Sequence, residues 1–160
     1  MTKPIMQRQA TVSGAQAAGL IAVLAISACS GGQRPSNSSL IGHLLAPCPD
    51  SPNCVSSQAS VESQRVDPLR YSGDAAAAQL RLLSVLKAMK RATVVHADAV
   101  SIQAEFRSAL FGFVDDVTFY FDPPGVIQVR SASRVGYSDL GVNRERVAEI
   151  RLRFSSNSLE

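Results

Sequence analysis

The chain has 160 residues with 16 lysines and arginines against 13 aspartates and glutamates, so its formal net charge is +3. The basic residues form neither the concentrated footprint that nucleic-acid binding requires nor a polybasic membrane patch. The length suits one domain with a real hydrophobic core, and the sequence shows no internal repeat or second domain.

Residues 1–28 are typical of a secretory signal peptide. Lys3 and Arg8 charge its start, an apolar run covers residues 15–26, and small residues lead into Cys29. The apolar run is short and rich in alanine, whereas a bilayer span needs about 20 strongly apolar residues. Small residues before a cysteine resemble the lipobox of bacterial lipoproteins. The resemblance implies cleavage just before Cys29 and attachment of a diacylglyceryl group to it, with palmitate as the expected acyl chain.

The segment 29–45 is predicted to be a flexible tether because it begins with a run of small and polar residues. Ser30 is not acidic, and in lipoprotein signals this implies the outer membrane, on its periplasmic side, within the cell envelope. A plain cleaved signal and an uncleaved anchor are the alternatives to lipidation. Loss of residues 1–28 leaves 14 basic and 13 acidic residues, so the mature chain has a net charge of +1.

Cys48 and Cys54 open the predicted domain, which covers residues 46–160. In an exported protein an isolated pair of cysteines is most simply a disulfide. A bridge across so short a loop would stabilise the fold by about 2 kcal/mol on the chain-entropy estimate. A zinc site would need more ligands than two thiols, and the spacing is not the Cys-x-x-Cys of redox proteins.

The first helix is expected to begin after Asp74, which stands at the N-cap before an alanine run. Its apolar face has helical spacing and comprises Leu82, Val85, Leu86 and Met89. Strands are then expected at 93–96, 100–108, 114–122 and 126–133, with a turn at 122–125 that makes the last two a hairpin. A final helix is expected from about Asn143, with one apolar side formed by Val147, Ile150 and Phe154.

Apolar and polar residues alternate along the predicted strands, as Ile102, Ala104 and Phe106 do with their neighbours. A sheet with one apolar face and two amphipathic helices is most simply a two-layer α+β sandwich. The short connections favour antiparallel pairing. The sequence therefore predicts a single, mostly antiparallel sheet of about four strands with both helices packed on one face.

Three polar segments, at 48–57, 104–116 and 129–146, resemble the domain-of-unknown-function family catalogued as 1499. They read CPDSPNCVSS, AEFRS followed by FGFVDD, and VRSASRVGYSDLGVNRER. The similarity extends over residues 47–154. It implies a single domain of a kind found in bacterial lipoproteins, membrane-associated proteins and plastid proteins. It implies no activity and transfers no catalytic residue.

The candidate binding residues gather in the stretch 130–146, which is unusually rich in arginine, serine and aspartate. Arg130, Arg134 and Arg144 would hold a carboxylate or phosphate, helped by backbone N–H groups at the start of the last helix. Alternatively, Asp115, Asp116 and Asp139 would neutralise these arginines in an ion-pair network. The predicted binding residues are Arg107, Asp116, Arg130, Ser131, Ser133, Arg134, Tyr137, Asp139, Asn143 and Arg144.

The protein is therefore predicted to be an envelope lipoprotein that binds an anionic small molecule, an envelope component or another envelope protein, without a metal or cofactor. The alternative is a hydrolase that uses Asp115 and Asp116 with Ser131 or Ser133. Adjacent aspartates on a strand point to opposite faces, so they do not readily act as a pair. No phosphate loop, dinucleotide fingerprint or nucleophile elbow is present.

Overall fold

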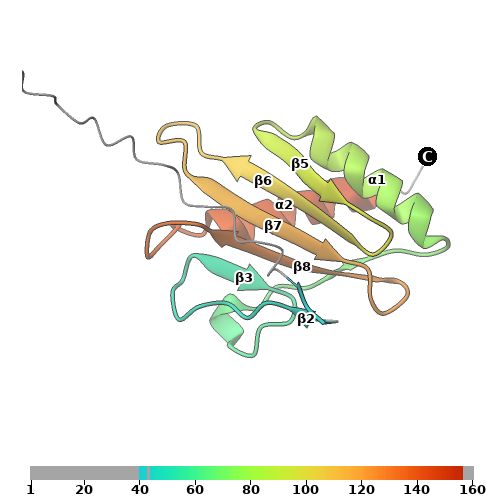
Figure 1. The fold of residues 1–160 in the computed structure, drawn as a ribbon, viewed down its shortest axis with the longest axis horizontal. Helices are drawn as coiled ribbons and strands as arrows, with labels where there is room; N and C mark the ends of the chain where they lie inside the picture. Colours follow the sequence, from blue (N-terminus) through green and yellow to red (C-terminus); the bar gives the residue numbers. More distant parts are fainter. Residues whose placement is uncertain (1–39, 43, 157–160) are drawn as a thin grey trace, which may run out of the picture.

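A computed structural model describes residues 40–42 and 44–156 of the chain. The predicted signal peptide, Cys29 and the first part of the predicted tether lie outside these residues. The described part is an α+β fold in which two helices cover one face of a mostly antiparallel sheet (Figure 1). No helix in these residues is both long enough and apolar enough to cross a membrane.

Helix α1 (Ala75–Ala88) begins where its sequence predicts. The carboxylate of Asp74 accepts a hydrogen bond of 2.9 Å from the backbone N–H of Ala77, which is the N-cap arrangement. The residues buried by the helix are Ala78, Leu82, Val85 and Leu86. This is the apolar face predicted from the helical spacing, and Met89 follows it as the C-cap.

Helix α2 (Val142–Ser156) starts one residue before the predicted position. Val147, Ile150 and Phe154 are at most 1% exposed, which confirms them as the buried side of the helix. Asn143 lies on the same side and is fully buried although it is polar. Burial of an amide requires hydrogen-bond partners, so this residue marks a polar site inside the fold.

The main sheet has the strand order β3-β8-β7-β6-β5, with β4 also paired to β8. Its four long strands occupy the predicted positions: β5 (Ala92–Ala97), β6 (Ser101–Arg107), β7 (Val114–Tyr120) and β8 (Val126–Ser133). All the neighbouring strands in this sheet pair antiparallel, as expected from the short connections.

The prediction of about four strands was wrong, because residues 40–42 and 44–156 contain eight strands in two sheets. The four that the sequence did not reveal are β1 (Leu40–Ile41), β2 (Leu44–Leu45), β3 (Cys54–Ser56) and β4 (Leu69–Arg70). Each has only two or three residues, too few to show an alternating pattern. Strands β1 and β2 pair with each other as the second sheet.

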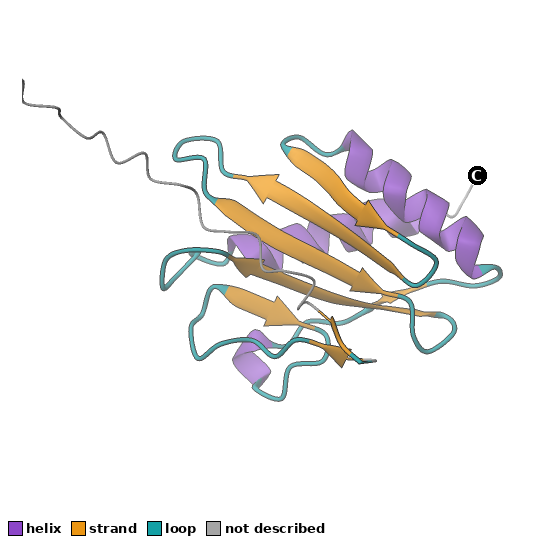
Figure 2. Ribbon diagram, viewed as in Figure 1, coloured by secondary structure: helices purple, strands orange, loops and turns teal. Residues whose placement is uncertain are grey.

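The hydrophobic core lies between the sheet and the two helices; in Figure 2, α2 runs behind the sheet and α1 lies at the right, beside β5. The register places Ile102 opposite Phe119 and Ala104 opposite Val117, so neighbouring strands direct apolar side chains to the same face. The residues that alternate with these along the strand, such as Gln103 and Glu105, point to the opposite face. The fold therefore presents many of its polar strand residues on a sheet face that neither helix covers, while Asp115 and Ser131 lie on the helix-covered face.

A disulfide joins Cys48 to Cys54, with an S–S distance of 2.03 Å. It connects the segment before β3 to the first residue of that strand, which pairs with Ala132 of β8. Nearby, Leu45 of β2 is 5% exposed and its backbone N–H donates to the side chain of Gln58 at 2.7 Å. The segment that leads into the domain is thus fixed to the edge of the sheet.

Candidate functional site

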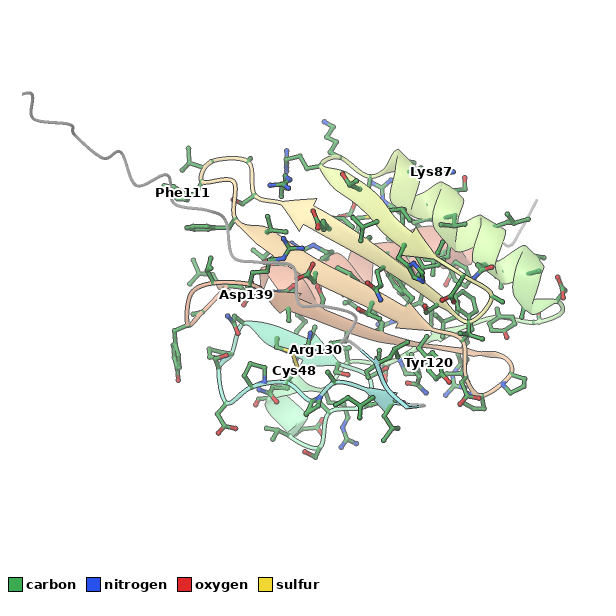
Figure 3. All side chains as sticks on the ribbon, in the orientation of Figure 1. Cys48, Lys87, Phe111, Tyr120, Arg130 and Asp139 are labelled. Atoms are coloured by element: carbon green, nitrogen blue, oxygen red, sulfur yellow. A yellow bond between two sulfur atoms is a disulfide. The ribbon has the colours of Figure 1, made fainter. Side chains whose placement is uncertain are left out.

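The ten predicted binding residues do not form one surface. The structure distributes them over the helix-covered face of the sheet, the uncovered face, the loop between β8 and α2, and helix α2, where Arg144 bonds to the backbone of residues 63 and 65. Figure 3 labels Arg130 on the sheet and Asp139 in the loop, at separate places in the fold.

Asn143 is the centre of a buried hydrogen-bond network between β8 and α2. Its amide nitrogen donates to the side chains of Ser133 at 3.1 Å and Asp139 at 2.7 Å. It also donates to the backbone carbonyl of Asn53 at 3.1 Å. Its carbonyl oxygen accepts from the Ser131 hydroxyl at 2.5 Å. The network joins the loop before β3, strand β8 and the start of α2.

Asp139 caps helix α2. Its carboxylate accepts hydrogen bonds from the backbone N–H groups of Gly141 at 3.0 Å and Asn143 at 2.8 Å. Burial alone would raise the pKa of Asp139, but these bonds and the one from the Asn143 amide outweigh it, so the pKa lies below its usual value. The helix start proposed to hold an external anion therefore already holds a carboxylate of the protein itself.

Arg146 extends the network to the sheet. One guanidinium nitrogen donates to the Asn143 carbonyl oxygen at 2.6 Å, and the other pairs with the Asp115 carboxylate at 2.6 Å. The guanidinium carbon lies 4.8 Å from the centre of the Phe106 ring, so the cation also stacks on an aromatic face. Both charged side chains are only 10% exposed, which makes this a nearly buried ion pair.

A second charged cluster occupies the sheet face that the helices leave uncovered. Arg134 binds Asp116 through two nitrogens, at 2.6 and 2.8 Å, and reaches Glu105 at 2.7 Å. The hydrogen bonds to Asp116 raise the pKa of Arg134 above its ordinary value although burial opposes them. Arg107 approaches Glu105 at 3.5 Å from the exposed edge of the cluster. This is the geometry of a bidentate structural ion pair.

Arg130 and Arg144 take part in neither of these two ion-pair clusters, and the hydrogen bonds of their side chains go to backbone carbonyls. Arg130 is opposite Thr118 in the sheet register, and its closest described polar contact is the Pro47 carbonyl at 3.5 Å. Burial lowers the pKa of Arg130, although the negative charge of Asp116 acts in the opposite direction. Arg144 donates to the carbonyl oxygen of Ser63 at 2.6 Å and that of Arg65 at 2.8 Å.

The three arginines of the predicted anion pocket therefore do not converge on one ligand. Arg134 is neutralised by Asp116, as the ion-pair alternative expected. Asp115 instead pairs with Arg146, and Asp139 caps a helix. Tyr137 is 73% exposed in the loop, away from both clusters.

The hydrolase alternative gains no support from this arrangement. Asp115 and Asp116 lie on opposite sheet faces, as the alternation predicts, and each is paired with a different arginine. Ser131 is fully buried and donates to an amide oxygen, while Ser133 accepts from the same amide group. Neither hydroxyl is placed beside a base that would activate it for attack.

A cleft with a volume of about 660 Å³ opens where the end of α1, the end of β6 and the first half of α2 meet. Its lining includes five cations, Lys90, Arg91, Arg107, Arg146 and Arg153, against three carboxylates, Asp115, Glu145 and Glu149. Phe106 and Val142 supply apolar wall. The lining residues thus carry an excess of two positive charges in a concave, partly apolar setting.

Two of these cations have no ion pair within the part of the chain that the structure describes. Lys90 and Arg91 follow the end of α1, and both are exposed. The side chain of Arg91 donates to the Arg107 carbonyl at 3.1 Å, which holds the two arginines side by side. Arg146 and Arg153 are already paired, with Asp115 and Glu149. The uncompensated charge therefore collects at the α1 end of the cleft.

Lys90 and Arg91 are not among the binding residues predicted from the sequence. Lys90 and Arg91 are far in sequence from Arg107, and only the pairing of β5 with β6 brings them together. Asn53 was missed as well, because it lies inside the cysteine loop and its role depends on the distant residues of α2. Among the described residues, no group of three or more histidines, cysteines or carboxylates is placed to hold a metal ion.

The model of the family described as "Protein of unknown function (DUF1499)" matches residues 44–154. The match includes the cysteine loop, both charged clusters and the cleft. No curated protein matches the chain.

Proposed function

We propose that this chain, which belongs to the DUF1499 family, is a lipid-tethered protein of the cell envelope whose domain binds an anionic ligand. Cys29 carries the lipid, and Ser30 directs the protein to the outer membrane, facing the periplasm. The domain is a binding module with one cationic cleft. The support for the tether is the signal-like start of the sequence, and the support for binding is the cleft.

The observation that carries the binding proposal is the pair of exposed cations Lys90 and Arg91, which have no ion pair in the described part of the chain and lie beside Arg107 in the cleft. By contrast, Arg134, Arg146 and Arg153 are engaged in ion pairs of 2.6–2.7 Å with carboxylates. Here the cations line a cleft with an aromatic wall and remain open to solvent. A guanidinium group can donate two parallel hydrogen bonds to two oxygens of a carboxylate or phosphate, so one of these anions is the expected ligand.

The cleft residues are separable from the residues that hold the fold together. Arg146 and Asp115 lie deeper, are nearly buried and belong to the network of Asn143. Lys90 and Arg91 are exposed and follow the helix. Substitution of these two cations should therefore change binding without unfolding the domain.

Titration with inorganic phosphate tests this assignment. The double variant Lys90→Gln with Arg91→Gln should bind phosphate at least tenfold more weakly than the wild type, which corresponds to about 1.4 kcal/mol. Lys87→Gln is the control, since it removes one positive charge from the last turn of α1 and does not line the cleft. Equal affinity of the double variant and the control would refute the cleft as the binding site.

Intact-mass analysis of the protein purified from membranes tests the tether. We expect a chain that begins at Cys29 and carries a diacylglyceryl group, and a Cys29→Ser chain that is neither lipidated nor retained in the membrane fraction. A wild-type chain without added lipid mass would contradict the proposed anchor.

A further inference from the structure

The end of the sheet next to the cleft carries an unusual number of exposed apolar side chains. Of the thirteen large hydrophobic residues that are exposed in the described part of the chain, seven lie in or directly beside two loops, at 108–113 and 134–141. Single exposed apolar residues are ordinary, but contiguous groups mark interaction sites. The seven, here called the apolar rim, are Leu110, Phe111, Phe113, Val135, Tyr137, Leu140 and Val142.

The two loops are neighbours in space. The backbone N–H of Arg134, which opens the second loop, donates to the carbonyl of Val114 at 3.0 Å, directly after the first loop. Figure 1 shows both loops at the same end of the sheet, where β6 and β8 finish and β7 begins. In Figure 3 Phe111 lies at the tip of the first loop, on the same side of the molecule as Asp139.

The first loop is shaped to present its apolar residues outward. The Ser108 backbone N–H donates to the Phe113 carbonyl at 2.8 Å, and the Phe113 N–H donates to the Ser108 hydroxyl at 2.9 Å. Gly112 has a φ of +66°, a conformation that places Phe111 and Phe113 beside each other with ring centres 5.5 Å apart. Because the loop is held by its own hydrogen bonds, little ordering is needed for it to bind.

The charge around the rim is positive. Ala109 and Val142 belong to the walls of the cleft, so the rim adjoins the cluster of Lys90, Arg91 and Arg107. Apolar and aromatic side chains flanked by lysine and arginine are the composition that enters the interfacial region of an anionic bilayer. A protein surface would also accept apolar groups, but apolar loops beside a cleft with an excess of positive charge match the headgroup layer better.

We infer that the apolar rim is a second membrane contact, in which the tips of the two loops insert into the interface of an anionic bilayer. The inference rests on the proposed tether, which brings the domain to the membrane. Ten residues lie between Cys29 and Leu40. At about 3.3–3.6 Å per residue the eleven steps from Cys29 to Leu40 span at most roughly 40 Å, which lets the domain approach the bilayer with its rim.

The absence of tryptophan from the chain allows a direct test. Phe111→Trp places a single fluorophore at the rim, and Leu80→Trp places one at a site on α1 that is 69% exposed, as the matched control. Each full-length chain is purified from membranes and reconstituted into protein-free vesicles of neutral and anionic phospholipids with brominated acyl chains. Intact-mass analysis of the same samples reports whether Cys29 carries lipid.

We expect the fluorescence of Phe111→Trp to shift to the blue and to be quenched at least twofold more than that of Leu80→Trp. Removing the anionic lipid, or adding Lys90→Gln and Arg91→Gln, should reduce this quenching. Lipidated chains with equal quenching of the two reporters would overturn the membrane contact and leave the tether standing. Strong quenching of Phe111→Trp in chains without lipid would support the membrane contact and overturn the tether. If the chains carry no lipid and Phe111→Trp is not quenched, the membrane contact and the tether are both overturned.

Discussion

Replacing Asn143 with alanine removes the centre of the buried network between β8 and α2. The side chain makes five hydrogen bonds, and two of them involve charged partners, Asp139 at 2.7 Å and Arg146 at 2.6 Å. Hydrogen bonds to charged groups contribute about 1.5–3 kcal/mol each, so these two alone account for about 3–6 kcal/mol. Both partners keep other contacts, to the backbone of α2 and to Asp115. We therefore expect the lower part of this range, about 3–4 kcal/mol.

Thermal and urea unfolding followed by circular dichroism measure this loss. For a domain of this size the expected loss lowers the melting temperature by roughly 10–15 °C. Leu80→Ala is the control, because this helical side chain is 69% exposed and should change stability by less than about 0.5 kcal/mol. If Asn143→Ala costs less than about 1 kcal/mol, water replaces the amide and the network is not what orients α2.

Three further predictions concern other parts of the fold. Arg134→Met removes the cation that bridges Asp116 and Glu105, two largely buried carboxylates, and should lower the free energy of unfolding by about 3 kcal/mol, measured in urea; a change near zero would show that these carboxylates are well hydrated. Changing Cys48 and Cys54 to serine should cost about 2 kcal/mol on the chain-entropy estimate for so short a loop, and unchanged melting would contradict it. The pKa of Asp98 is lowered from 3.8 to about 2, mainly by its hydrogen bond with His96. A carboxylate with a depressed pKa stabilises the fold above its unfolded pKa and loses this effect as the pH falls through its folded pKa. Since the side chain is 46% exposed, Asp98→Asn should therefore cost less than about 1 kcal/mol at pH 7, and the difference should fade between about pH 4 and pH 2. A difference that persists at pH 2 would contradict the assignment to this carboxylate.

The helices and the four long strands could be predicted because their signals are local. The spacing of Leu82, Val85 and Leu86 defines one face of α1, and Asp74 marks its first turn. The alternation in β6 distinguishes its two faces within a few residues. The short strand β3 carries no such pattern, and only its pairing with β8 defines it.

The site was harder to predict because its residues meet through long-range contacts. The stretch 130–146 was recognised as polar and important, yet alternation along β8 sends Ser131 to the helix-covered face, while Arg134 lies in the ion-pair cluster on the uncovered face. Arg146 pairs with Asp115, which is 31 residues away in sequence, and this choice of partner depends on how α2 lies across the sheet. A count of arginines in one segment could not reveal which of them are neutralised.

The same reason explains why the unpaired cations were not predicted as a site. Lys90 and Arg91 have an ordinary role at a helix end, and their functional interest arises only from the nearby Arg107 and from the cleft. What distinguishes them is the lack of a carboxylate partner in the described part of the chain. That property belongs to the folded arrangement, not to the sequence.

Native mass spectrometry of the lipidated protein, purified gently from membranes, tests the central claim most directly. The account predicts that the wild type and Lys87→Gln retain an anionic adduct, while the double variant Lys90→Gln with Arg91→Gln does not. An adduct that persists in the double variant, or its absence from the wild type, would contradict the assignment of the cationic cleft as the binding site.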